Sequence, residues 1–107
     1  MSNPVRGGGG DDQRDLDLIA RWKAGDERAA TELVERHSAA LARFAVSSGE
    51  RSDIDELVQD TFVRAFNSLD GFRGESSFRT WLFTIERRLL LDRRRSEKRR
   101  RDRTEIQ

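Results

Sequence analysis

The stretch Ile54-Asp55-Glu56-Leu57-Val58-Gln59-Asp60-Thr61-Phe62-Val63-Arg64-Ala65-Phe66 decides the fold of this 107-residue chain. Its apolar side chains recur at intervals of three and four residues, which places them on one face of an α-helix. Ser52 with Asp55 three residues later resembles a capping box that uses Asp in place of Glu, so we expect the helix to begin there. Gly71 predicts its end. The apolar face comprises Ile54, Leu57, Val58, Phe62, Ala65, Phe66 and Leu69.

Three further helices are predicted on either side of this stretch. Gly25 ends a first short helical pattern, and Asp26 is a good N-cap for a second helix. Ser76 or Ser77 caps a fourth helix beyond a loop that contains two glycines. No segment alternates with period two for long enough to predict a strand. The sequence therefore predicts an all-α fold, a compact bundle of about four helices. The apolar face of the fourth helix comprises Phe78, Trp81, Leu82, Ile85 and Leu89.

The two ends of the chain differ in composition from its middle. Residues 1–14 contain the run Gly7–Gly10 and are predicted to be a disordered tail. We expect residues 15–96 to form the folded domain and residues 97–107 to begin a basic linker. The net charge of +1 hides an asymmetry, because residues 87–103 hold ten Arg or Lys against three acids and the rest carries a net charge of −6. A basic end on an acidic body suggests contact with a polyanion, although solvated tails have the same composition.

The composition excludes several classes of protein. There is no Cys, so disulfides and thiolate metal sites are impossible, and the single His37 has no cluster of carboxylates around it in the sequence. No nucleophile, base and ligand set can be assembled, so we expect no enzyme, no catalytic or metal site and no cofactor. No apolar run has the length of a membrane span and no signal peptide is evident, so we expect a soluble, cytoplasmic protein without membrane insertion.

A polar patch on the helix around residue 60 is the first candidate site. Glu56, Gln59 and Asp60 stand at i, i+3 and i+4, so they form one compact surface opposite the apolar face. Such a patch could dock a basic helical partner, while an ordinary solvated helix face has the same pattern. The full set of candidate residues is Asp55, Glu56, Gln59, Asp60 and Arg64.

The loop at residues 70–77 and the helix after it are the second candidate site. Two glycines allow close approach of the backbone, and a helix N-terminus offers free N–H groups to a phosphate or an extruded base. Phe72 lies in a polar loop without a periodic partner, whereas Phe78 and Trp81 also fit a purely structural core. Aromatic planes combined with positive charge are typical of sites for single-stranded nucleic acid. If the fourth helix continues, four of its arginines would contact phosphates: Arg87, Arg88, Arg94 and Arg95.

Two long motifs together resemble a known family. The run DELVQDTFVRAF at residues 55–66 is similar to the region 2.2 signature of extracytoplasmic-function sigma factors of RNA polymerase. The run FRGESSFRTWLFTI at residues 72–85 resembles the loop and helix that this family uses at the promoter. The resemblance extends over about residues 15–96 and includes the Gly25-Asp26 turn.

The resemblance implies partners for both candidate sites. The patch at residues 55–64 would bind the clamp helices of the RNA polymerase β′ subunit. The loop would capture a base flipped from the single-stranded non-template strand of the minus-ten promoter element, and the fourth helix would hold the neighbouring bases and backbone. Members of this family are usually inhibited by an anti-sigma factor. The implied DNA-binding residues are Asp70, Gly71, Phe72, Arg73, Gly74, Glu75, Ser76, Ser77, Arg79, Thr80, Trp81, Arg87, Arg88, Arg94 and Arg95.

Two departures from the family pattern and two rival interpretations remain. Family members commonly carry a small residue and then an Asn around the positions of Glu86 and Arg88, so Arg88 suggests either a contact with the DNA backbone or an altered base preference. The family normally has a C-terminal region 4 domain as well, and this domain is absent from the sequence, which ends where the linker to it would begin. Either the sequence is truncated or this is an isolated domain with reduced promoter selectivity. The rivals are a small helical protein-interaction module and a DNA-binding domain without sequence preference.

Overall fold

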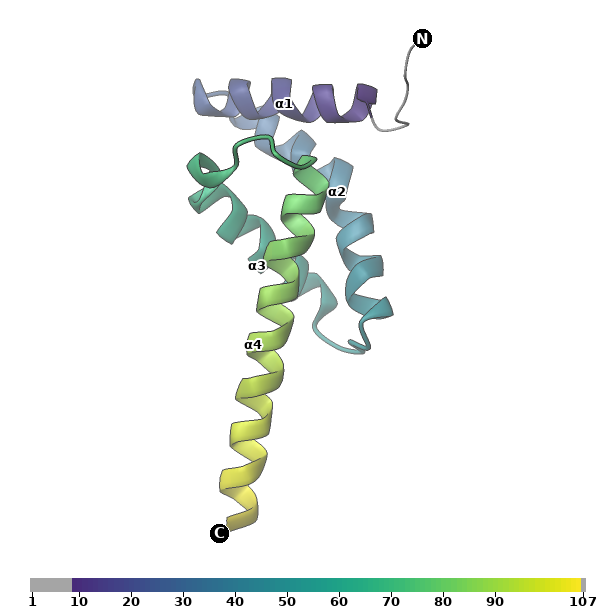
Figure 1. Ribbon diagram of the computed structural model, residues 1–107, viewed down its shortest axis with the longest axis vertical. Coiled ribbons are helices and arrows are strands. Elements are labelled where there is room, and N and C mark those ends of the chain that lie inside the picture. The colour runs from purple at the N-terminus through teal and green to yellow at the C-terminus, as the bar shows by residue number, and fades with distance from the viewer. Residues whose placement is uncertain (1–8, 107) are drawn as a thin grey trace.

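The computed structural model describes residues 9–106, and its architecture is all-α (Figure 1). The helices are α1 (Gly9–Lys23), α2 (Glu27–Ser47), α3 (Ile54–Asn67) and α4 (Phe78–Ile106), with a short 3-10 helix η1 (Leu69–Gly71) after α3. Within the described residues there is no strand, and no helix is long and apolar enough to cross a membrane. The predicted fold class of about four helices is confirmed.

The helix ends test the predicted caps. Asp26 caps α2, because its side chain accepts a hydrogen bond from the backbone N–H of Arg28 at 3.0 Å. Of the two candidates for α4, Ser77 is the cap: its Oγ accepts from the backbone N–H of Thr80 at 3.1 Å. The predicted capping box at Ser52 is wrong. Asp53 precedes α3 in a left-handed conformation with a φ of 57° and makes no side-chain capping bond.

The N-terminal boundary also differs from its prediction. α1 begins at Gly9, so the part of the predicted tail at residues 9–14 is helical, and the part at residues 1–8 lies outside the described residues. Two acids in the first turn, Asp11 and Asp12, favour this start because they face the positive end of the helix dipole. The Arg36 side chain of α2 also donates to the backbone carbonyl of Asp11 at 2.9 Å, which holds this turn against α2.

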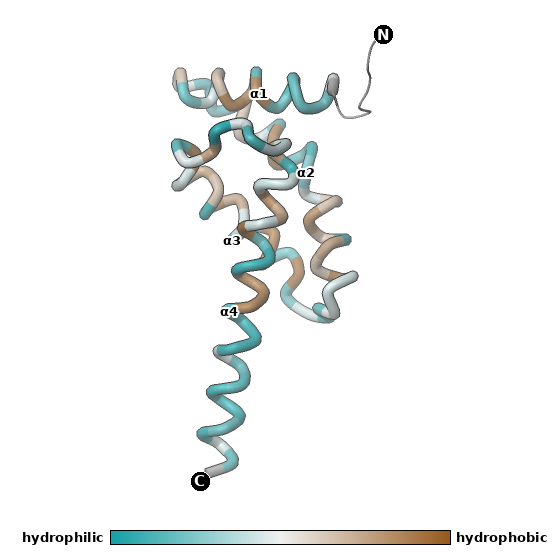
Figure 2. Tube along the Cα trace, viewed as in Figure 1, coloured by the Kyte–Doolittle hydropathy of each residue, from teal (hydrophilic) through white to brown (hydrophobic). Residues whose placement is uncertain are grey.

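The core lies where α2, α3 and the first half of α4 meet, with α1 lying across one end (Figure 1). Leu33, Leu41 and Leu82 are fully buried, and Leu57, Phe78 and Leu18 are 1% exposed. The hydropathy changes along α4, which is largely apolar inside the bundle and hydrophilic beyond it (Figure 2). Burial of this apolar surface is the main favourable term that holds the helices together.

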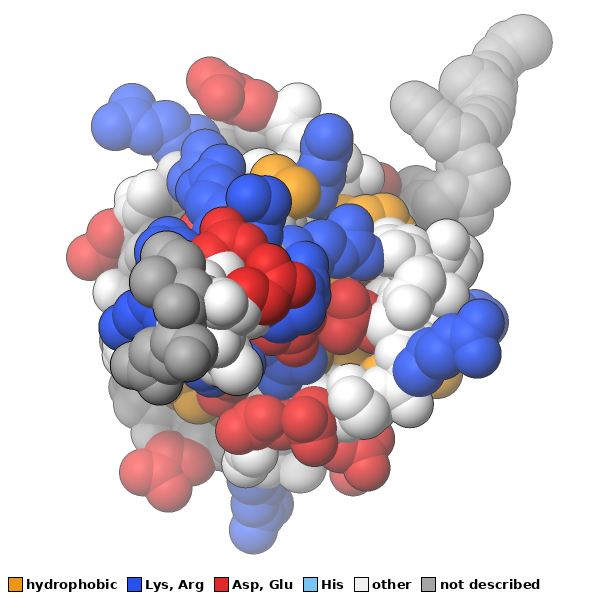
Figure 3. Space-filling model, turned by 90° about the horizontal axis from the view of Figure 1, so that it is seen from below, with side chains coloured by type: hydrophobic (Ala, Val, Ile, Leu, Met, Phe, Trp, Pro, Cys, Tyr) orange, Lys and Arg blue, Asp and Glu red, His pale blue; other side chains and the backbone are white. Residues whose placement is uncertain are grey.

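The second half of α4 projects from the bundle. Its continuation through Ile106 makes the described chain 62 Å long against 34 and 21 Å in the other directions. The radius of gyration is accordingly 16.6 Å, compared with about 13 Å for a globular chain of this length. Viewed from the C-terminal end of α4, Lys and Arg side chains lie on several sides of the helix with acids among them (Figure 3). Residues 97–105 therefore form an exposed, basic helical extension.

Candidate functional site

The predicted polar patch lies on the exposed surface of α3. All five of its members are exposed: Asp55, Glu56, Gln59, Asp60 and Arg64. They divide between two grooves, since Asp55 and Gln59 line the groove between α2 and α3 while Asp60 and Arg64 line the groove between α3 and α4. Glu56 is engaged within the fold, because its Oε1 lies 3.3 Å from Nη2 of Arg93.

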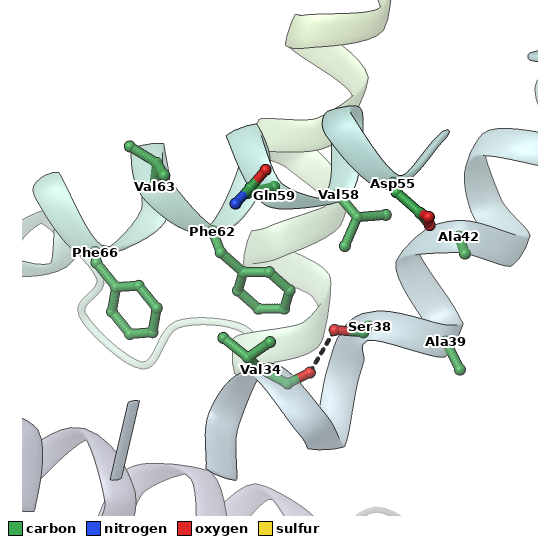
Figure 4. A pocket seen from close by; sticks show the side chains of 10 residues that line it. All are labelled: Val34, Ser38, Ala39, Ala42, Asp55, Val58, Gln59, Phe62, Val63 and Phe66. Carbon is green, nitrogen blue, oxygen red and sulfur yellow. Dashed lines mark hydrogen bonds between the residues drawn. The ribbon is translucent and has the colours of Figure 1, made fainter. Parts of the chain in front are cut away.

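The groove between α2 and α3, the α2–α3 groove, is mainly apolar and has a volume of about 730 Å³. Figure 4 shows Val34 of α2 and Phe62 and Phe66 of α3 around it, with Asp55 toward one end. The Ser38 hydroxyl donates to the carbonyl of Val34 at 2.6 Å, so it presents little free polarity to the groove. This groove can take apolar side chains of a partner, with polar groups of the patch at its rim.

The groove between α3 and α4, the α3–α4 groove, lies on the other side of α3 and has a volume of about 790 Å³. It brings together the predicted DNA-binding residues Gly71, Trp81 and Arg88 with the polar residues Asn67 and Thr84. Sequence reasoning missed Asn67, Ser68 and Thr84, although spacing of three or four residues from Arg64 and Arg88 could have located them on this face. The complete lining is Asp60, Val63, Arg64, Asn67, Ser68, Gly71, Trp81, Thr84, Ile85, Arg88 and Leu89.

The loop between α3 and α4 is held by its aromatic residue. Phe72 is half-buried, and its ring centroid lies 5.5 Å from that of Phe78 and 5.2 Å from that of Trp81. Phe72 has no partner at helical spacing in the sequence, yet it packs on these two rings because η1 turns the chain back onto the start of α4. Gly74 has a φ of +76°, a backbone conformation that residues other than Gly rarely adopt. Arg73 and Glu75 remain exposed beside it.

Several other predicted DNA-binding residues already have partners in the fold. Asp70 lies 3.8 Å from Nζ of Lys23 in α1. The Ser77 hydroxyl donates to Oγ1 of Thr80 at 3.0 Å as part of the cap, while Ser76 donates to the carbonyl of Ser77. These contacts order the loop and the first turn of α4 and leave the backbone of the loop at the surface.

The four arginines of α4 that were predicted to contact phosphates fall into two groups. Arg87 and Arg88 are exposed and make no ion pair with any described residue. Arg94 is bound to the backbone carbonyl of Ser48 and lies 3.5 Å from Glu50, and Arg95 lies 3.4 Å from Asp92. Of the four predicted phosphate contacts, Arg87 and Arg88 are thus the two that can meet phosphates without breaking a contact within the described residues.

Arg79 points toward α2. Its Nε donates to Nδ1 of His37 at 3.1 Å, and its Nη2 donates to the backbone carbonyl of Arg36 at the same distance. His37 is in turn 2.9 Å from Oδ2 of Asp15, whose Oδ1 accepts from Arg36 at 2.8 Å. Burial opposes the ionisation of Asp15, but its hydrogen bonds with His37 and Arg36 outweigh that effect and lower its pKa.

Glu86 is a second buried charge-bearing residue. Its side chain is fully buried, and neither carboxylate oxygen has a hydrogen-bond partner. Burial raises the pKa of Glu86 to about 7, since the charged form has lost its hydration. This residue occupies one of the positions at which the sequence departs from the resembled family, and the departure is a polar group placed in the apolar core.

Comparison with known proteins agrees with this architecture. Residues 33–100 match the family described as Sigma-70 region 2. The chain belongs to this family. The RNA polymerase sigma factor NccH of Alcaligenes xylosoxydans xylosoxydans is 46% identical over 79 residues, which are 73% of this chain and 42% of that protein. The ECF RNA polymerase sigma-E factor of Haemophilus influenzae is 39% identical over 71 residues, or 66% of this chain and 38% of that protein.

A third relative is the RNA polymerase sigma factor CnrH of Cupriavidus metallidurans, 48% identical over 69 residues, or 64% of this chain and 36% of that protein. The chain thus aligns with less than half the length of these relatives. Their names and the family match confirm the resemblance to extracytoplasmic-function sigma factors that the two motifs indicated. They also agree with the expectation that the chain is not an enzyme.

Proposed function

We propose that this domain acts in the cytoplasm in bacterial transcription initiation, where it binds core RNA polymerase and stabilises the melted minus-ten promoter element. The single observation that carries the proposal is the pair of grooves on opposite sides of α3, one apolar and one polar and aromatic. Two different partners can therefore engage α3 together. The domain supplies binding and leaves the chemistry to the polymerase.

The α3–α4 groove and the adjacent loop would hold single-stranded DNA. Trp81 offers an aromatic face, Asn67 and Thr84 offer hydrogen-bonding groups, and Arg88 offers positive charge in the same groove. Base stacking contributes about 1–3 kcal/mol per base and tolerates different sequences, so the polar groups would supply selectivity. A flipped base that is bound here repays the free energy of unpairing, and this stabilises the open promoter.

The α2–α3 groove would receive the clamp helices of the β′ subunit. An amphipathic helix places apolar side chains into such a groove, and its basic residues can pair with acids at the rim. Asp55 and Gln59 line this groove, and Asp60 follows Gln59 on the exposed surface of α3, toward the α3–α4 groove. An anti-sigma factor that covers either groove would then prevent transcription initiation.

The DNA-binding half of the proposal is tested by fluorescence anisotropy with single-stranded, minus-ten-like oligonucleotides of varied sequence across a salt series. Arg88→Ala and Arg73→Ala should each weaken binding severalfold, because both side chains are exposed near the loop. Arg51→Ala removes the same charge from an exposed position in the loop between α2 and α3, and it is the matched control. Binding without sequence preference, equally reduced by all three variants, would instead indicate a generic phosphate contact.

The polymerase-binding half needs a separate measurement, by calorimetry with a fragment that carries the β′ clamp helices. Asp55→Arg should weaken binding about tenfold, since the reversed charge at the rim of the α2–α3 groove would repel basic residues of the clamp helices. Asp17→Arg, the same change at an exposed site on α1, should bind as the wild type does. Equal affinities of Asp55→Arg and wild type, with unchanged helical circular dichroism, would remove the α2–α3 groove from this interface.

A further inference from the structure

A chain of buried hydrogen bonds connects three helices next to the loop. Asp15 of α1 and His37 of α2 are each 2% exposed, and their side chains meet at 2.9 Å. The other ring nitrogen of His37, Nδ1, faces Nε of Arg79 in the first turn of α4 at 3.1 Å. None of these contacts lies in either groove, so the proposed DNA and polymerase interfaces leave them unexplained.

The hydrogen-bonding partners of His37 determine which of its two ring nitrogens carries the hydrogen. An arginine side chain can only donate, so Nδ1 of His37 must accept from Arg79. The proton then resides on Nε2 and is donated to the Asp15 carboxylate, whose other oxygen takes the hydrogen bond from Arg36. The charged groups around the ring are therefore Asp15 from α1, Arg36 from α2 and Arg79 from α4. Asp11, also from α1, lies behind Arg36.

The chain of bonds orients the start of α4. His37 Nδ1 and the carbonyl of Arg36 together hold two nitrogens of the Arg79 guanidinium, only two residues after the Ser77 cap. The neighbouring ring of Phe78 packs edge-on against His37 at 5.6 Å and against Phe72 of the loop at 5.5 Å. A shift of Arg79 or Phe78 would therefore move the loop aromatic residue.

We propose that His37 is a positioning residue for DNA reading, which acts through Arg79 to fix the loop and the first turn of α4 without touching DNA. This role rests on the proposed function of the loop. It also assigns Arg79 differently from the sequence-based expectation, as a structural link to α2 in place of a direct DNA ligand. The geometry of a binding site often depends on such supporting hydrogen bonds, because the contacting groups must be held in place before the ligand arrives.

Two substitutions at His37 separate its two bonds. Asn places an amide near the position of Nδ1 and can still accept from Arg79, whereas Gln reaches the position of Nε2 and can still donate to Asp15. In anisotropy measurements with the minus-ten-like oligonucleotides, His37→Gln should weaken binding about tenfold. His37→Asn should stay within about threefold of wild type even if both variants lose comparable thermal stability. The proposal would be overturned if the DNA affinity of the two variants fell in proportion to their loss of thermal stability, whichever hydrogen bond each variant keeps.

Arg79→Ala supplies the second arm. If His37 acts through Arg79, adding His37→Gln to Arg79→Ala should cause no further loss beyond about twofold. The slope of log affinity against log salt should also stay unchanged in Arg79→Ala, while loss of a true phosphate contact reduces it by about 0.7 for a single strand. A reduced slope would overturn the proposal, and this variant decides the matter if the His37 variants do not fold.

The outcomes also separate this role from the function on which it rests. A wild-type domain without sequence preference for single-stranded DNA would overturn the proposed function, and the role of His37 with it. A wild type that shows the preference, together with a folded His37→Gln variant of equal affinity, would overturn the role of His37 alone.

Discussion

Two buried acids in this domain have opposite surroundings. Asp15 and Glu86 are 2% and 0% exposed, yet Asp15 is bound by Arg36 and His37 while neither oxygen of Glu86 has a partner. Their pKa values move in opposite directions, below the usual range for Asp15 and up to about 7 for Glu86. Burial alone therefore does not determine whether a buried acid raises or lowers the free energy of unfolding. The hydrogen bonds that its carboxylate accepts determine the sign.

The largest effect is expected from removal of the paired acid. Asp15→Ala leaves His37 and Arg36 without their shared acceptor, and breaking a buried pair in this way should lower the free energy of unfolding by about 4 kcal/mol. Urea denaturation followed by circular dichroism at pH 7 measures it. Asp17→Ala, two residues along α1 and exposed, should change stability by less than about 0.5 kcal/mol. Similar losses in the two variants would show that the buried network adds little.

Removal of the unpaired acid should have the opposite sign. Glu86→Met keeps a similar volume and eliminates a carboxylate without partners. It should raise the free energy of unfolding at pH 8 by about 3 kcal/mol, which corresponds to the shift of the pKa from 4.5 to about 7. The same urea titration checks this gain. A destabilised Glu86→Met variant would mean that the carboxylate has a stabilising contact in solution.

The pKa shifts of the two acids also predict how the free energy of unfolding changes with pH. The raised pKa of Glu86 means that its contribution is most favourable below pH 4.5 and is lost as the pH rises toward about 7. The lowered pKa of Asp15 means that its contribution is present above its ordinary value of 3.8 and is lost at more acidic pH. Stability should therefore be highest near pH 4 to 5 and fall by about 2 kcal/mol between pH 5 and 8.

Glu86→Gln is the control for that profile. The amide has the same shape and cannot ionise, so the decline between pH 5 and 8 should disappear in this variant while the loss at acidic pH remains. A decline of unchanged size in Glu86→Gln would assign it to other groups.

The sequence could locate the buried polar residues but could not pair them. Asp15 precedes Leu18 and Ile19 by three and four residues, and His37 and Glu86 each stand four residues from a core leucine on either side. Helical spacing therefore places all three on apolar faces. Which of them is paired depends on contacts across 22 residues from Asp15 to His37 and 42 from His37 to Arg79, and no local pattern encodes them.

The same division holds for the candidate site. Periodicity predicted the helices and the exposed surface of α3, because each depends on residues within one or two turns. The left-handed backbone of Asp53 was not predicted, because a capping box is recognised from the types of side chain in the sequence, which do not specify the φ angle. The α3–α4 groove was only partly anticipated, as its lining combines residues 60–71 with residues 81–89, and only the packing of two helices brings them together.

The smallest effect is expected at Thr61, which completes the comparison of buried polar groups. Its side chain is fully buried, and its hydroxyl donates at 2.8 Å to the carbonyl of Leu57, one turn earlier in the same helix. That bond connects no second element, and the Leu57 carbonyl is already within the helical hydrogen-bond pattern. Thr61→Val keeps the shape and should change the free energy of unfolding by less than about 1 kcal/mol. Suppose that urea denaturation instead showed that Thr61→Val loses as much free energy of unfolding as Asp15→Ala. That result would mean that a buried hydrogen bond within one helix matters here as much as hydrogen bonds that connect two helices.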